Sequence, residues 1–93
     1  MIKVNEYFGG NVRSLGFDGP GGSSTVGVMV PGEYTFSTGA PETITVISGL
    51  MDVRLPGSDV WRSFPAGTTF DVVGQSSFDL RIGVATAYLC LFR

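Results

Sequence analysis

Short apolar runs recur about every ten residues along the chain, separated by glycine, proline and serine. Within 42–48, polar and apolar side chains alternate with the period of two that is typical of a half-buried strand. No segment has apolar residues at helical spacing over three turns. The pattern therefore predicts an all-β chain, with strands near residues 11–17, 25–30, 32–37, 42–48, 50–55, 60–64, 68–73, 77–83 and 86–92.

Glycine and proline mark the predicted turns. The glycine-rich segment 18–24 is predicted to be a loop, and a simple connector is favoured over a lid. Ser48-Gly49 predicts a tight hairpin, with further turns at 56–59 and 65–67. Nine short strands need protected edges, which two packed sheets or a small barrel provide. Residues 1–93 are thus expected to form a single-domain, all-β jelly roll, either a barrel or a sandwich.

Strand alternation also predicts which side chains face the interior. Glu42 shares a face with Ile44, and Tyr34, Phe36 and Thr38 share a face on the preceding strand. Glu42 is either a solvated carboxylate at the mouth of the fold or an inward group whose partial burial favours its protonated form. The two aromatic rings are either ordinary core or the wall of a pocket on which a planar ligand stacks.

Three other residues have competing interpretations. Arg13 shares its face with Leu15 and Phe17, and an exposed residue at a strand end is favoured over a functional cation. Trp61 is predicted to pack, although a dimer contact or a ring at a pocket mouth would also fit. Cys90 is interpreted as a small buried hydrophobic group rather than a nucleophile, because the chain has no histidine to activate it.

The composition limits the possible partners. The chain has 93 residues, of which 43% are hydrophobic and 15% charged, so we expect a homodimer that covers apolar surface. Six scattered basic residues and a net charge of −2 argue against binding to nucleic acid. No segment is apolar over a membrane-spanning length or resembles a secretion signal, and the single cysteine suits a reducing compartment. We therefore expect a cytoplasmic protein without membrane contact.

A motif spacing points to one fold family. The chain reads Gly32-x5-Thr38-x-Ala40-x-Glu42-x6-Gly49, followed by Pro65-x-Gly67-x2-Phe70, which resembles the spacing of cupins. In that resemblance Thr38, Ala40 and Phe70 occupy the positions of the metal-binding histidines, and only Glu42 remains. Since one carboxylate does not make a transition-metal site, we expect neither a bound metal nor a cofactor.

Several further blocks resemble one family along nearly the whole chain. They are Asn5-Glu-Tyr-Phe8, Ser14-Leu-Gly-Phe17, Val26-Gly-Val-Met-Val30, Gly32-Glu-Tyr-Thr-Phe-Ser-Thr38, Thr45-Val-Ile-Ser-Gly49 and Tyr88-Leu-Cys90. Together they are similar to the small, single-domain cupins of the bacterial pyrimidine/purine nucleoside phosphorylase family. The resemblance implies phosphorolysis of diverse nucleosides to free base and α-D-ribose 1-phosphate, with phosphate as co-substrate and a role in nucleoside salvage.

This reaction needs positioning more than a nucleophilic side chain, because the transition state resembles a ribosyl cation attacked by phosphate. Glu42 could accept hydrogen bonds from ribose hydroxyls or stabilise positive charge, and Arg13 with Ser37 or Thr38 could bind phosphate. Tyr34, Phe36 and Phe70 could stack on the base, which would allow broad base tolerance. The alternatives are a noncatalytic small-molecule-binding cupin, a metal-dependent cupin enzyme and a purely structural dimerisation module.

Overall fold

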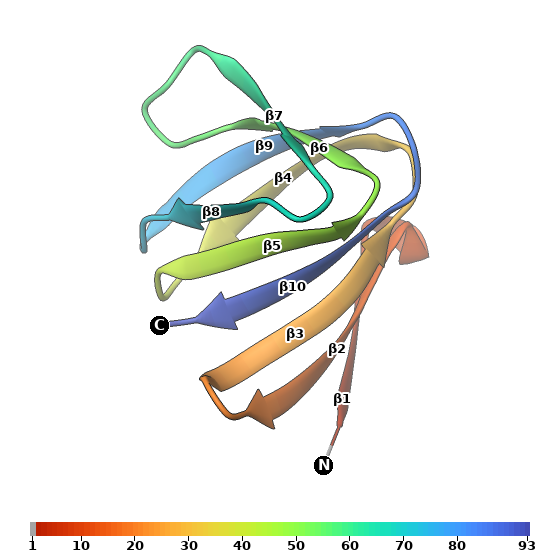
Figure 1. Ribbon diagram of the computed structural model, residues 1–93, viewed down its shortest axis with the longest axis vertical. Coiled ribbons are helices and arrows are strands. Elements are labelled where there is room, and N and C mark those ends of the chain that lie inside the picture. The colour runs from red at the N-terminus through yellow and green to blue at the C-terminus, as the bar shows by residue number, and fades with distance from the viewer. Residues whose placement is uncertain (1) are drawn as a thin grey trace.

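Two antiparallel sheets make up the computed structural model, which describes residues 2–93 (Figure 1). The six-stranded sheet has the order β1-β2-β3-β10-β5-β8, and the four-stranded sheet has the order β4-β9-β6-β7. The element bounds are β1 Lys3–Tyr7, η1 Phe8–Gly10, β2 Val12–Gly19, β3 Gly22–Met29, β4 Gly32–Thr38, β5 Glu42–Ser48, β6 Leu50–Arg54, β7 Trp61–Pro65, β8 Thr69–Val72, β9 Ser76–Ile82 and β10 Thr86–Phe92.

The all-β prediction is confirmed, and the nine expected strands correspond to β2 through β10. The sheets pack face to face as a sandwich and do not close into a barrel, so the sandwich form of the predicted jelly roll is the correct one. The first strand, β1, was not predicted from the sequence. Within the described residues, no helix is long and apolar enough to cross a membrane.

The glycine-rich segment is ordered structure rather than the predicted loop. Strand β2 continues to Gly19 and β3 begins at Gly22, and these two residues pair directly across a tight turn. Gly22 has a φ of +123°, which L side chains rarely adopt, so glycine suits the turn. The loop prediction is wrong because glycine, although typical of loops, can also pair its backbone with a neighbouring strand.

The predicted hairpin at Ser48-Gly49 is also wrong. Strands β5 and β6 belong to different sheets, so this turn carries the chain across the sandwich. Gly49 has a φ of +96°, and a Cβ atom there would collide with Thr86. The two other predicted turns are confirmed: 56–59 joins the paired strands β6 and β7, and 65–67 connects β7 to β8.

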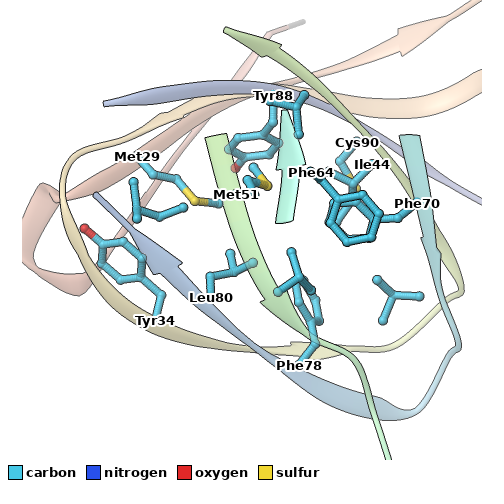
Figure 2. Close-up of a cluster of buried hydrophobic side chains, with 14 of the residues drawn as sticks. Met29, Tyr34, Ile44, Met51, Phe64, Phe70, Phe78, Leu80, Tyr88 and Cys90 are labelled. Atoms are coloured by element: carbon cyan, nitrogen blue, oxygen red, sulfur yellow. The ribbon is translucent and has the colours of Figure 1, made fainter. Parts of the chain in front are cut away.

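The core lies between the sheets, as Figure 2 shows, and follows the predicted alternation. Ile44 of β5, Met51 of β6 and Leu80 of β9 are all at least 96% buried. Burial of one such side chain stabilises the fold by about 1.5–3 kcal/mol. Tyr34 of β4 is buried as well, and its hydroxyl donates to the carbonyl of Val30 at 2.6 Å.

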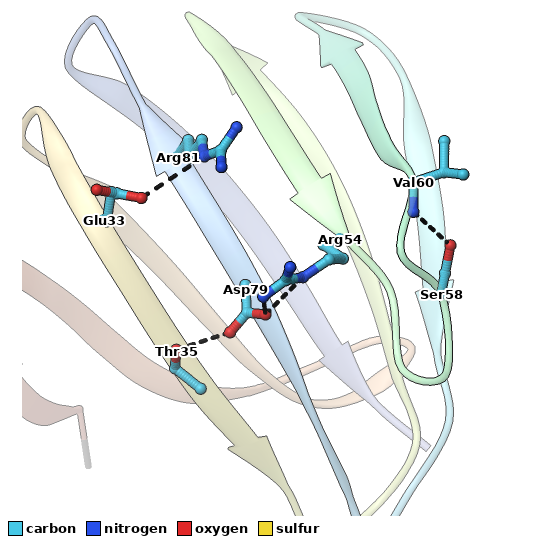
Figure 3. A network of polar contacts seen from close by, with 7 residues as sticks. All are labelled: Glu33, Thr35, Arg54, Ser58, Val60, Asp79 and Arg81. Carbon is cyan, nitrogen blue, oxygen red and sulfur yellow. Dashed lines mark hydrogen bonds and ion pairs between the residues drawn. The ribbon is translucent and has the colours of Figure 1, made fainter.

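Charged residues cover the outer face of the four-stranded sheet, as predicted (Figure 3). Asp79 accepts from the Arg54 guanidinium at 2.7 Å and from the Thr35 hydroxyl at 2.7 Å, and these bonds lower the pKa of its carboxyl group. Trp61 is half-buried on this face, where the Arg81 guanidinium lies 3.8 Å from the centroid of its ring. The packing role favoured for Trp61 therefore takes the form of a cation–π contact outside the core.

Candidate active site

A cavity of about 520 Å³ lies between the two sheets. Tyr7 and Phe8 line the cavity and are each more than 40% solvent-accessible, which places their rings at its mouth. The other lining residues are Ser14, Thr25, Met29, Thr35, Phe36, Ser37, Glu42, Ile44, Met51, Phe78, Leu80, Tyr88, Cys90 and Phe92.

The cavity has one polar side and one aromatic side. Its polar side is the inner face of the six-stranded sheet, which supplies Ser14, Thr25, Glu42, Tyr88 and Cys90. The opposite wall comes from the four-stranded sheet and carries the apolar side chains of Phe36, Met51, Phe78 and Leu80. A ligand between the sheets would therefore meet hydrogen-bonding groups on one side and ring faces on the other.

Glu42 is the single carboxylic acid that borders this cavity among the described residues. It begins β5, is half-buried, and has its pKa raised by burial. The Cys90 thiol donates to Oε1 of Glu42 at 3.4 Å and partly opposes that rise. Of the two interpretations of Glu42 left open by the sequence, the inward one agrees with this position.

Cys90 is buried and free, as the sequence suggested. Burial raises the pKa of its thiol, and the neighbouring Glu42 raises it further, so the thiol remains protonated at neutral pH. A protonated thiol is a poor nucleophile but can donate a hydrogen bond. The sequence analysis did not identify this contact with Glu42.

Tyr88 supplies a second hydrogen-bonding group on the polar side. Its ring lies over Gly27 of β3, near Ser14, whose hydroxyl accepts from the Asn5 amide at 3.2 Å. Burial raises the pKa of Tyr88 to about 12. Tyr88 therefore presents a neutral hydroxyl to the cavity throughout the physiological pH range.

The aromatic side is a cluster built from three parts of the chain. Phe36 of β4 stacks on Phe78 of β9, with 6.1 Å between ring centroids. Phe8 of η1 meets Phe36 edge to face at 5.4 Å, and Tyr7 of β1 does so at 5.8 Å. The junction of β1 and η1 at residues 7–8 thus reaches from the six-stranded sheet to β4, the edge strand of the other sheet. The rings of Tyr7 and Phe8 complete the cavity wall there.

The structure gathers some of the predicted site residues and separates others. Glu42, Phe36 and Ser37 border the cavity. Thr38 instead donates to the carbonyl of Val73 at 2.8 Å and accepts from the amide of Ser76 at 3.0 Å, which ties β4 to the start of β9. Both hydrogen-bonding functions of that hydroxyl are therefore used within the fold.

Tyr34, Phe70 and Arg13 lie outside the cavity lining. Tyr34 is buried against Phe8, and Phe70 packs on Phe64 with 4.5 Å between ring centroids. The Arg13 side chain is 66% exposed on the outer face of β2. Because the sheet separates it from the cavity, Arg13 cannot contact a ligand bound there within one chain.

Sequence reasoning missed Ser14, Thr25, Tyr88 and Cys90. Alternation within β2, β3 and β10 places each of them on the inner face. What could not be foreseen was that β10 lies between β3 and β5, which brings Cys90 opposite Thr25 and close to Glu42.

Metal-binding groups are not assembled within residues 2–93, where no cluster of three or more histidine, cysteine, aspartate or glutamate residues could hold an ion. Of the positions that carry histidines in the cupin spacing, Thr38 is hydrogen-bonded to backbone and Phe70 is core. The residues present therefore do not fit the metal site of that fold family.

Comparison with known proteins agrees with this geometry. Residues 2–92 match the family model described as pyrimidine/purine nucleoside phosphorylase. A Vibrio cholerae protein of that name is 58% identical over 92 residues, covering 99% of this chain and 97% of the relative. The crystal structure of a Vibrio parahaemolyticus protein of unknown function has 52% identity and a TM-score of 0.93, covering 97% of this chain and 96% of that one. An RmlC-like cupin from Shewanella frigidimarina shares the fold, with 16% identity, a TM-score of 0.76 and coverage of 99% and 83%.

Proposed function

This chain belongs to the pyrimidine/purine nucleoside phosphorylase family, and from that premise we propose that it splits nucleosides with phosphate in the cavity between its sheets. The products are a free purine or pyrimidine base and α-D-ribose 1-phosphate. The observation that carries the site assignment is the two-sided cavity, which matches a ligand with a planar base and a hydroxyl-rich sugar. Its volume of about 520 Å³ falls within the usual range for small-molecule sites.

Base recognition rests on the aromatic side. Phe36 and Phe78 present ring faces, and Phe8 closes the mouth beside them. Every nucleobase has a π-face, so stacking tolerates purines and pyrimidines alike, whereas hydrogen bonds to base edges would select among them. The composition of this wall supports broad base specificity.

The polar side faces the ribose and the reacting bond. A phosphate oxygen forms a bond to C1′ while the bond from C1′ to the base nitrogen breaks, and the base leaves with the electron pair. The Glu42 carboxylate accepts from ribose hydroxyls and offsets the positive charge that develops on the sugar. Glu42 is thus the proposed catalytic residue, and its half-buried position strengthens such interactions relative to water.

In this proposal, uncharged hydrogen-bond donors bind the phosphate. Among the described residues, neither lysine nor arginine borders the cavity, whose polar side carries Ser14, Thr25 and Tyr88. Hydroxyl and backbone N–H donors can bind an anion without a cation beside it. We propose that the reaction needs neither metal nor cofactor, which accords with the poor fit of these residues to a metal site.

The test is phosphate-dependent release of base from uridine, adenosine and guanosine by protein freed of metal with a chelator. We expect all three bases to be released, with ribose 1-phosphate as the second product and no loss of rate after chelation. If base release stops after chelation, metal independence is refuted, but the proposed phosphorolysis is not. Nucleoside binding without base release in phosphate would instead favour a noncatalytic binding cupin.

A homodimer is also proposed, formed through the outer face of β1, β2, β3 and β10. Cross-strand pairing aligns Val4, Leu15, Val26 and Leu89 in one row across these strands. With Ile2, Phe17 and Val28 they form the outer apolar patch, in which Ile2, Val4, Leu15, Phe17, Val26 and Val28 are 37–68% exposed. The rest of this face, on β5 and β8, carries the hydrogen-bonded pairs Thr43 with Asp71 and Thr45 with Thr69.

A second copy of the chain is the occupant that suits the outer apolar patch. The patch amounts to on the order of 500 Å², near the upper end of what a monomer exposes. A stable dimer needs about 800 Å² per partner, which the patch and its polar surroundings can supply. Glu6 and Arg13 lie opposite each other at 3.7 Å beside the patch, so a twofold axis can pair each with its opposite charge on the other copy.

Replacing Leu15 by glutamate is expected to convert the dimer to a monomer, because it buries a charge in the centre of the outer apolar patch. Sedimentation velocity across a concentration series measures the change. Thr69→Glu adds the same charge to the polar half of the face and is expected to leave the dimer intact. A wild-type protein that remains monomeric at high concentration would exclude this interface.

We also place the protein in the cytoplasm and in nucleoside salvage. The unpaired, hydrogen-bonded Cys90 thiol suits a reducing compartment.

A further inference from the structure

Cys90 and Glu42 form a contact whose role goes beyond packing. Glu42 and Cys90 both border the cavity, and the thiol donates to Oε1 of the carboxyl group at 3.4 Å. Within residues 2–93, no side-chain hydrogen bond engages Oε2 of Glu42. One oxygen of Glu42 is therefore held by the protein, while the other is available to a ligand.

The thiol and the carboxyl group come from neighbouring strands of the six-stranded sheet. Cys90 of β10 pairs with Ile44 of β5, two residues beyond Glu42, and Thr25 of β3 lies directly opposite Cys90 on the other side. Thr25, Cys90 and Glu42 thus lie across β3, β10 and β5 along the polar side of the cavity.

We propose that Cys90 is a positioning residue for phosphorolysis, which fixes the Glu42 carboxylate through Oε1 and presents Oε2 to the ribose. This inference rests on the proposed function for its catalytic part, whereas the hydrogen-bonded pair itself can be measured without any substrate. Alanine at position 90 would leave the carboxylate free to rotate, whereas serine would retain a donor.

The pair is tested first through the thiol itself, because Cys90 is the only cysteine and its S–H stretching band in the infrared spectrum can be assigned directly. The titratable groups near the thiol are Glu42 from β5 and Tyr88 from its own strand. A hydrogen bond to a charged carboxylate is stronger than one to a neutral amide, so Glu42→Gln is expected to raise the S–H stretching frequency. The readout is the infrared spectrum of the native protein above neutral pH, and Glu33→Gln, on the outer face of β4, is the matched control.

The positioning role is tested by the pH profile of kcat/KM in Cys90→Ala and Cys90→Ser. Loss of a hydrogen bond to a charged group is expected to reduce kcat/KM about tenfold in the alanine variant. Because the thiol lowers the pKa of Glu42, its removal should also shift the acid limb of the profile to higher pH. Serine should restore both the rate and the position of that limb.

The two experiments separate the possible failures. An S–H stretching band that is identical in wild type and Glu42→Gln would overturn the pair itself, whatever the activity. A confirmed pair with an unshifted acid limb in Cys90→Ala would overturn the positioning role. If no base is released by the wild-type protein, the proposed function fails, while the S–H band still decides whether the pair exists.

Discussion

Glu42→Gln is expected to lower kcat/KM by about 10²–10³-fold while the protein stays folded, because the amide cannot stabilise positive charge on the ribose. Glutamine keeps the size of the side chain and can still accept from the Cys90 thiol, so the loss would report the charge itself. Initial rates of base release at several uridine and phosphate concentrations measure the effect. Glu33→Gln removes an exposed carboxylate that pairs with Arg81 and is expected to keep the wild-type rate.

The pH dependence of activity and stability follows from the same carboxyl group. Burial raises the pKa of Glu42 from its ordinary value of 4.5, so the carboxylate form, and with it kcat/KM, should be lost as the pH falls through this raised value. For stability the sign is opposite: a raised folded-state pKa means that protonation favours the folded protein. Glu42→Gln should therefore raise the Tm at neutral pH, and this advantage should shrink as the pH falls through the raised pKa and vanish below the unfolded value. An activity near wild type in Glu42→Gln would remove Glu42 from the mechanism.

Gly27→Ala is expected to be the most damaging single-methyl change in the cavity. A Cβ atom at this position would lie 2.6 Å from the Tyr88 hydroxyl oxygen and 2.8 Å from the carbonyl oxygen of Arg13. The ring could move only into the cavity, and the Arg13 carbonyl belongs to the paired backbone of β2. Such overpacking costs about 1–3 kcal/mol.

Thermal unfolding measures this cost. A loss of about 2 kcal/mol corresponds to a Tm lower by roughly 8–16 °C in a domain of this size. The KM for nucleoside should also rise, because the displaced Tyr88 ring occupies ligand space. Gly39→Ala is the matched control, since a Cβ atom there would meet nothing within 4 Å. Equal Tm values for the two variants would show that Tyr88 does not lie over Gly27.

Short apolar runs bounded by glycine, proline and serine were sufficient to predict nine strands, and in β4, β6 and β9 the larger apolar side chains also lie on the inner face. Strand β1 reverses this pattern: Val4 faces out, while Lys3 and Asn5 are on the face that pairs with Gly16 and Ser14. Strand β1 is the edge strand of the larger sheet and has few core residues opposite it. Its apolar residues therefore do not mark a buried face. Arg13 shares a face with Leu15 and Phe17, which suggested an inward position. Because these two residues belong to the outer apolar patch, that face in fact points outwards.

The site was only partly predictable for a related reason. Glu42 was noticeable because a carboxylate interrupts an apolar face, and Phe36 because aromatic residues alternate along β4. Tyr88 and Cys90 lie in the apolar strand 86–92, where nothing in the local pattern distinguishes a cavity hydroxyl or thiol from core. Their role depends on strand order, which brings Glu42 and Cys90, 48 positions apart, into contact and which local periodicity does not encode.

The placement of the polar and aromatic sides on different sheets has a consequence for how such a protein can change. In the proposed site, substitutions on β4 and β9 would alter which bases fit and would leave the polar residues on β2, β3, β5 and β10 untouched. We therefore expect that substrate range and rate can be varied independently, one sheet at a time. A laboratory library confined to Phe36, Phe78 and Phe8 should yield variants with narrowed base preference and nearly unchanged turnover on the bases they retain.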